Sequence, residues 1–118
     1  MSFNGTEGTG ISLSTAAKLT QSYREANPKP ETILGCFLGK DILNKLLAQP
    51  GCEGIRFYYG LNGNIPELVA VGADSEENDQ LGIVSGIQCI IADDAPRCPP
   101  HSSQPNALNT TPQQHEVK

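Results

Sequence analysis

The hydrophobic periodicity of this chain changes at Pro50-Gly51, from a helical spacing to the alternation of a strand. Over residues 37–47, apolar side chains recur every three or four positions, which predicts an amphipathic helix that ends before the proline. Over residues 55–59, apolar residues alternate with Arg56 and Tyr58, which predicts a strand. A run of helices followed by a run of strands favours an α+β domain over an alternating α/β one.

An earlier helix is predicted over about residues 13–26. Ser12 is a good N-cap, and Ile11 can pack on Ala16 one turn into the helix. Asn27-Pro28-Lys29-Pro30 ends it, because a residue that precedes proline is disfavoured in the α conformation. The apolar side of this helix is weak, so we expect it to lie on another part of the protein.

Three strands are predicted after the second helix. Asn62-Gly63 is a strong hairpin signal, and residues 67–72 form the return strand. Residues 74–79 form an acidic, solvated turn, and residues 81–92 form a third strand with its two glycines as candidate bulges. The sequence therefore predicts two N-terminal helices packed on one face of a small antiparallel sheet of three or more strands.

The ends of the chain differ in composition from its middle. Residues 1–10 carry almost nothing to bury and are expected to form a flexible arm. Residues 11–94 form a single α+β domain, and residues 95–118 form a disordered or extended tail rich in proline and serine. A domain of about 85 residues buries a marginal core, so we expect a homo-oligomer.

The charge of the chain excludes several partners. Eight Lys and Arg against thirteen Asp and Glu give a formal net charge of −5. Nucleic acid and anionic membrane surfaces both require basic patches, so neither is expected as a partner. The N-terminus lacks the positive and apolar regions of a signal peptide, which favours a cytoplasmic protein.

The predicted interaction surface lies on the first strand. If Phe57 and Tyr59 pack on the helices, Arg56 and Tyr58 point outward from the opposite face. Tyr and Arg are enriched among the residues that dominate the energy of protein interfaces. The other face of the third strand would extend this surface with apolar side chains. The interface expected to join copies of the chain comprises Arg56, Tyr58, Val84 and Ile90.

One alternative is a metal site in the tail. Cys98 and His101 have a spacing that can place two ligands on one zinc ion, and Cys36 or Cys52 could complete the site. Structural zinc sites usually present two closely spaced pairs, and this sequence has only one. No cofactor is therefore expected.

A second alternative is a thiol enzyme. Cys36 lies close to the start of the second predicted helix, whose dipole would stabilise a thiolate, with Lys40 one turn away. The histidines that could act as a base, His101 and His115, both lie in the tail. Neither a dinucleotide-binding glycine pattern nor a phosphate-binding loop occurs. We therefore assign no catalytic residue and favour a non-enzymatic interaction module.

Several short segments together carry a resemblance to known sequences. Gly35-Cys-Phe-Leu-Gly-Lys40, Gln49-Pro-Gly-Cys-Glu-Gly-Ile-Arg56 and Val71-Gly-Ala-Asp74, with the first helix, resemble a set of small bacterial hypothetical proteins over about residues 11–100. The resemblance implies no activity, so no functional residue is carried over from it. In such sequences the Cys-Pro-Pro segment is often followed by another cysteine, where this chain has Ser102-Ser103.

Overall fold

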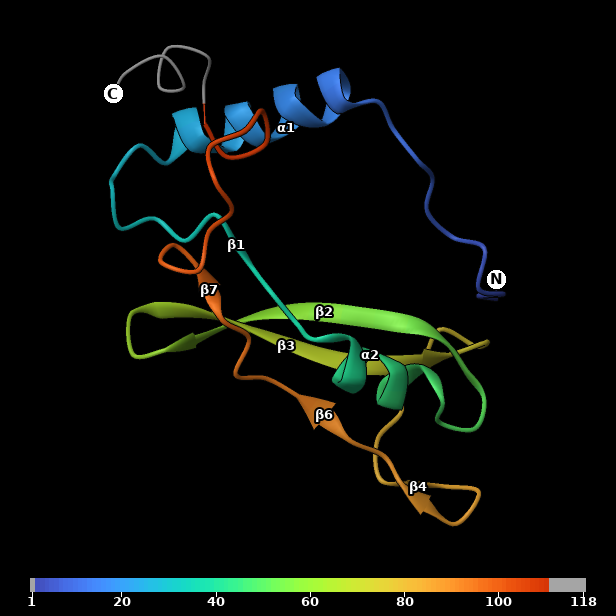
Figure 1. The fold of residues 1–118 in the computed structure, drawn as a ribbon. Helices are drawn as coiled ribbons and strands as arrows, with labels where there is room; N and C mark the ends of the chain where they lie inside the picture. Colours follow the sequence, from blue (N-terminus) through green and yellow to red (C-terminus); the bar gives the residue numbers. More distant parts are fainter. Residues whose placement is uncertain (1, 111–118) are drawn as a thin grey trace. The chain divides into compact units, whose positions relative to one another are not determined.

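The computed structural model describes residues 2–110 (Figure 1). Contacts divide them into two compact units, which are described separately. The sheet unit comprises residues 2–8 and 37–95, and the α1 unit comprises residues 9–36 and 96–110. Helices and strands both occur and the strands pair antiparallel, so the predicted α+β class is confirmed.

The sheet unit is built on a long antiparallel hairpin. β2 (Cys52–Asn62) pairs with β3 (Ile65–Asp74), and β3 pairs on its other side with β6 (Ile91–Ala92). The predicted hairpin is confirmed, and its two loop residues are Gly63 and Asn64 because Asn62 pairs with Ile65. Gly63 adopts a φ of 65°, which glycine reaches without steric cost.

The predicted continuous third strand over residues 81–92 is wrong. The chain instead forms a short hairpin from β4 (Ile83–Val84) and β5 (Ile87–Gln88) before it reaches β6. Ser85 and Gly86 both have positive φ, 50° and 77°, as the two central residues of a type I′ turn require. Gly86 therefore reverses the chain and does not mark a bulge in a single strand.

The second predicted helix is confirmed as α2 (Lys40–Leu47), which packs on β2 and β3 (Figure 1). Leu46 is the only large side chain of the described residues that is fully buried, and it contacts Ala70 and Ala92. The small alanine side chains let the helix approach the sheet closely. The partly buried residues around this core are Leu38, Ile42, Ile55 and Ile90.

A pair of buried glutamines joins the end of α2 to the sheet. The Nε2 of Gln49 donates to Oε1 of Gln80 at 3.2 Å, and the Nε2 of Gln80 donates to the carbonyl of Pro50 at 2.7 Å. The backbone N–H of Ile90 donates to Oε1 of Gln49 at 2.8 Å, and that of Gln80 donates to the carbonyl of Gly72. Each bond satisfies a polar group that burial would otherwise leave without a partner.

The α1 unit holds α1 (Leu13–Ala26) and a short pairing of β1 (Gly35–Cys36) with β7 (Arg97–Cys98). The predicted helix and its N-cap are confirmed, since the Thr15 N–H donates to the Ser12 hydroxyl at 3.1 Å. No residue of α1 is buried. Packing on the sheet is confirmed for α2, and for α1 it stays a prediction.

Parts of the predicted arm and of the predicted tail have backbone partners in the described residues. The N–H of Phe3 donates to the carbonyl of Ser75 at 2.9 Å, so the start of the predicted arm lies against the sheet unit. In the predicted tail, Ala95 is buried in the sheet unit and β7 pairs with β1. Residues 111–118 of that tail lie outside the described part. None of the helices in residues 2–110 is long and apolar enough to cross a bilayer.

Candidate interaction site

Arg56 and Tyr58 lie together on the face of β2 that points away from α2. Ile55 packs on the α2 side, and alternation along the strand places Arg56 and Tyr58 opposite. Both converge on the carboxylate of Asp79. The Arg56 Nη1 donates to Asp79 Oδ1 at 2.5 Å, and the Tyr58 hydroxyl donates to Asp79 Oδ2 at 2.7 Å. Each carboxylate oxygen therefore has its own donor.

This cluster shifts the pKa values of its members away from neutrality. The hydrogen bond from Tyr58 and then the Arg56 guanidinium hold the pKa of Asp79 below its usual range. The same carboxylate raises the pKa of Tyr58, because removing the phenolic proton would lose the bond and place two anions side by side. A general acid or base works best with a pKa near the operating pH, so this cluster favours a structural or binding role over proton transfer.

The acidic turn that ends at Asp79 is held by internal hydrogen bonds. The Oδ1 of Asp74 accepts the N–H groups of Glu76 at 2.9 Å and Asn78 at 3.0 Å. Glu77 has a φ of 71°, and its carbonyl accepts from the Arg56 guanidinium at 3.2 Å. The prediction of a merely solvated turn is therefore wrong for its last residue, which the turn directs onto β2.

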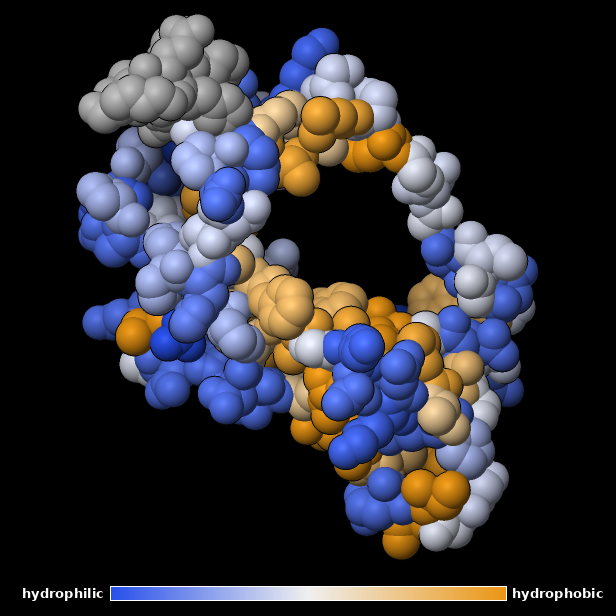
Figure 2. All heavy atoms as spheres, in the orientation of Figure 1, coloured by the Kyte–Doolittle hydropathy of each residue, from blue (hydrophilic) through white to orange (hydrophobic). Residues whose placement is uncertain are grey.

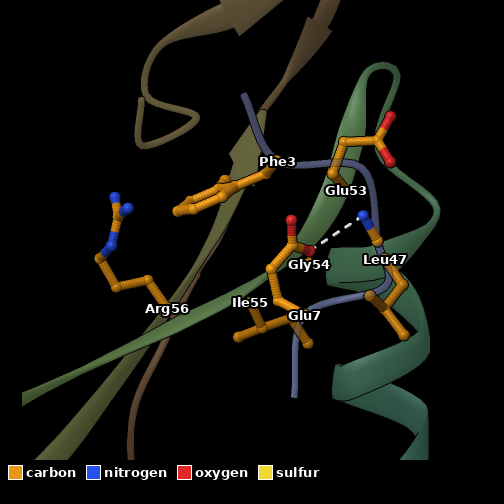
Figure 3. A pocket seen from close by; sticks show the side chains of 9 residues that line it. Phe3, Glu7, Leu47, Glu53, Gly54, Ile55 and Arg56 are labelled. Atoms are coloured by element: carbon orange, nitrogen blue, oxygen red, sulfur yellow. Dashed lines mark hydrogen bonds between the residues drawn. The ribbon is translucent and has the colours of Figure 1, made fainter. Parts of the chain in front are cut away.

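The N-terminal segment of the sheet unit, residues 2–8, adds an aromatic ring to this site. The guanidinium carbon of Arg56 lies 5.6 Å from the centre of the Phe3 ring, within the range of a cation–π contact. Where the segment meets β2 it leaves a pocket of about 440 Å³ (Figure 3). The residues that line this pocket are Phe3, Gly5, Glu7, Leu47, Glu53, Gly54, Ile55, Arg56 and Ala73.

The carboxylate of Glu7, which lines the pocket, already accepts hydrogen bonds from its own segment. Glu7 accepts the N–H groups of Asn4 and Gly5, each at 3.0 Å, and Figure 3 shows its bond to Gly5. The bond from Asn4 is the main cause of the lowered pKa of Glu7. Glu7 therefore holds the shape of the N-terminal segment, and its bonds are made without a ligand.

Beyond the reach of α2, the hairpin carries apolar side chains with little cover. Phe57, Tyr59 and Leu61 share the α2 face of β2, and their exposed fractions are 48%, 89% and 73%. Figure 2 shows hydrophobic surface over the sheet unit, including its lower end, where Figure 1 places the β4–β5 hairpin. The condition that Tyr59 packs on the helices is not met, since Tyr59 is 89% exposed and the eight-residue α2 covers the other end of the hairpin.

The predicted interface residues are only partly brought together. Arg56 and Tyr58 adjoin, as expected from alternation. Ile90 instead packs against the core around Leu46, on the side of α2, because the chain leaves the β4–β5 hairpin before it reaches this residue. Val84 is half-buried in that hairpin. Asp79, which sequence reasoning missed, is the residue that joins Arg56 to Tyr58.

The metal and thiol alternatives gain no support from the geometry. None of the four cysteines forms a disulfide, and the Cys98 thiol donates to the carbonyl of His101 at 2.9 Å. Within residues 2–110, no three His, Cys, Asp or Glu side chains are close enough together to hold a metal ion. Cys36 lies in β1, and α2 begins four residues later at Lys40.

Comparison with known proteins adds no relative. No protein-family model, no curated protein and no solved structure matches this chain.

Proposed function

We propose that this protein is a small, non-enzymatic interaction module that self-associates through the edge of its sheet. The proposal includes a cytoplasmic location and kinship with the small bacterial proteins that the sequence resembles. One observation carries the self-association: β2, the longest strand, is an edge strand. It pairs with β3 on one side and with no other strand of the described chain.

The composition of β2 favours pairing at this edge. Natural edge strands are usually short or carry lysine, proline or inward-pointing charges that block addition of another strand. β2 has 11 residues and contains neither lysine nor proline. From Phe57 to Leu61 it carries no charge at all. An edge with these features is suited to pairing with another strand.

The register of the hairpin indicates which backbone groups face the edge. Paired residues of an antiparallel ladder alternate between hydrogen-bonded and non-hydrogen-bonded pairs. Ile55 pairs with Gly72, and the Gly72 carbonyl accepts from Gln80 on the outer side of β3. Ile55 therefore belongs to a non-hydrogen-bonded pair. By alternation, Phe57, Tyr59 and Leu61 also direct their N–H and C=O groups to the free edge.

Arg56 and Tyr58 support this edge from the opposite face. Their shared bonds to Asp79 tie β2 to the turn after β3, which limits the conformational freedom that pairing would otherwise have to remove. Tyr58 is 47% exposed, so its ring remains available for contact with a second copy.

Sedimentation velocity over a range of protein concentrations tests the proposal. The wild-type protein is expected to shift from monomer to dimer as concentration rises. Tyr59→Pro removes an N–H that faces the edge and leaves the β3 ladder intact, so it should weaken the dimer at least tenfold, or about 1.4 kcal/mol. Tyr59→Thr keeps the N–H and a strand-forming side chain, and serves as the matched control.

Two results would contradict the proposal. One is a wild-type protein that stays monomeric at every concentration. The other is a Tyr59→Pro variant that associates as strongly as Tyr59→Thr. Far-UV circular dichroism of both variants shows whether the sheet has been retained.

A further inference from the structure

We infer that two copies pair their β2 strands antiparallel about a two-fold axis at Tyr59. In this register Tyr59 lies opposite Tyr59 of the second copy, and Phe57 lies opposite its Leu61. The inference rests on the proposed self-association and specifies the surface that performs it.

The N-terminal segment limits which part of β2 can pair. Gly5 lies against Glu53: a Cβ placed on Gly5 would be 3.3 Å from Glu53 Oε1 and 3.5 Å from its carbonyl oxygen. Phe3 lies against Arg56, and both residues line the pocket at the start of β2. The half of β2 that remains open for pairing runs from residue 57 to the hairpin loop.

The backbone favours Tyr59 as the centre of the pairing. Residues directly opposite each other in a sheet have their side chains on the same face. A two-fold axis between the two strands must therefore place one residue opposite its own copy, and cannot fall between two successive residues of a strand. An axis at Tyr59 matches all the edge-facing groups of 57–61 with one another. An axis at Tyr58 would pair Leu61 with Ile55, which packs on the α2 core, and an axis at Gly60 would pair Phe57 with the loop.

The side chains are complementary in the same register. On the α2 face, the aromatic ring of Tyr59 meets its own copy and Phe57 meets Leu61, which are favourable cross-strand pairs. On the other face, the Tyr58 ring lies opposite Gly60 and can cover the exposed glycine backbone.

Charge also agrees with this register. Any charged residue at a two-fold axis faces its own copy, and like charges opposite each other destabilise a sheet. Arg56 is the charged residue of β2 closest to the proposed axis, and there it lies opposite Asn62. The strand is therefore complementary to its own reversed copy, which identifies a second copy as the partner.

Photo-oxidative coupling of tyrosines tests the register in the native chain. The protein contains three tyrosines, Tyr23, Tyr58 and Tyr59. Brief illumination with a ruthenium tris-bipyridyl complex and persulfate should give a covalent dimer, and peptide mapping should place the dityrosine between the two copies of Tyr59. Tyr59→Phe keeps the ring and loses only the hydroxyl, so it should lose the covalent dimer while sedimentation still shows association. Tyr23→Phe, on α1 and outside the proposed interface, should keep both.

The outcomes distinguish a failure of the proposed self-association from a failure of the proposed register. A protein that sediments only as a monomer overturns the proposed self-association. A protein that sediments as a dimer and yields a dityrosine at Tyr58 or Tyr23, or yields none, overturns the register and leaves the self-association standing.

Discussion

Gly72 is the position in the sheet unit where one added methyl group is expected to do most damage. A Cβ placed there would lie 2.5 Å from Oε1 of Gln80, 2.9 Å from Nε2 of Gln49 and 3.2 Å from the Cys52 thiol. Flexible side-chain ends can usually move away from such a contact. These two amides cannot move cheaply, because both are buried and each is tied to the backbone of another segment.

The expected change in the free energy of unfolding combines two costs and one gain. Forcing an extra methyl into a packed site typically costs about 1–3 kcal/mol. Separating the two amides loses a hydrogen bond worth about 1 kcal/mol, and more where a buried amide is left without a partner. Alanine in a strand recovers about 0.5–1 kcal/mol relative to glycine. We expect Gly72→Ala to lower the free energy of unfolding by about 2–3 kcal/mol.

Urea unfolding followed by far-UV circular dichroism measures this change, since the chain has no tryptophan to serve as a fluorescent probe. The protein concentration is held fixed because association would itself stabilise the fold. Gly54→Ala is the matched control: it lies in the same hairpin, and a Cβ there meets no atom within 4 Å. We expect this control to be neutral or slightly stabilising.

A Gly72→Ala variant as stable as the wild type would refute the reasoning. The double variant Gly72→Ala/Gln80→Ala provides a second check, because removing the Gln80 side chain also removes the shortest contact. Its loss of stability should be smaller than the sum of the two single losses. A strictly additive result would show that the methyl group acts by some route other than the glutamine pair.

Two further predictions concern the core and the charged cluster. Leu46→Ala should destabilise the protein by about 2–5 kcal/mol in urea unfolding, because it empties the centre of the core, and no loss would contradict that packing. Asp79→Asn should lower the free energy of unfolding at neutral pH. The pKa of Asp79 is lowered in the folded state, so its carboxylate contributes stability above the unfolded pKa of about 3.9. That contribution disappears as the pH falls through the lower pKa of the folded state. Urea unfolding across acidic pH should therefore show a weaker pH dependence for Asp79→Asn than for Glu76→Gln, an exposed carboxylate of the same turn, and equal dependences would contradict the role of the cluster.

Features set by neighbouring residues could be predicted from the sequence. The α1 helix begins and ends where its cap and its prolines indicate, and α2 follows its apolar stripe. The β2–β3 hairpin follows from alternation on both sides of Asn62-Gly63. The β4–β5 hairpin was missed because apolar residues continue on both sides of its turn, although Ser85-Gly86 is a turn dipeptide that could have indicated it.

The candidate site could be predicted only in part, because half of it depends on distant contacts. Alternation alone places Arg56 and Tyr58 on one face. Their common partner Asp79 lies 21 residues beyond Tyr58, and Gln80 lies 31 residues beyond Gln49. No periodicity connects residues at such separations. The acidic turn looked like an ordinary solvated loop because its composition does not reveal which carboxylate turns back to the sheet.

The small core explains why these polar contacts matter for the interaction edge. With Leu46 as the only fully buried large side chain of the described residues, apolar packing alone specifies the strand register weakly. The side chains of Gln49 and Gln80 lie against Gly72 on the α2 face, and the backbone N–H of Gln80 donates to the Gly72 carbonyl at the outer edge of β3. Asp79 ties β2 from the opposite face. Both constraints act on the half of the hairpin near α2. Toward the hairpin loop, Phe57, Tyr59 and Leu61 keep the same register with exposed side chains. Under the proposed function, their edge-facing backbone groups pair with a second copy.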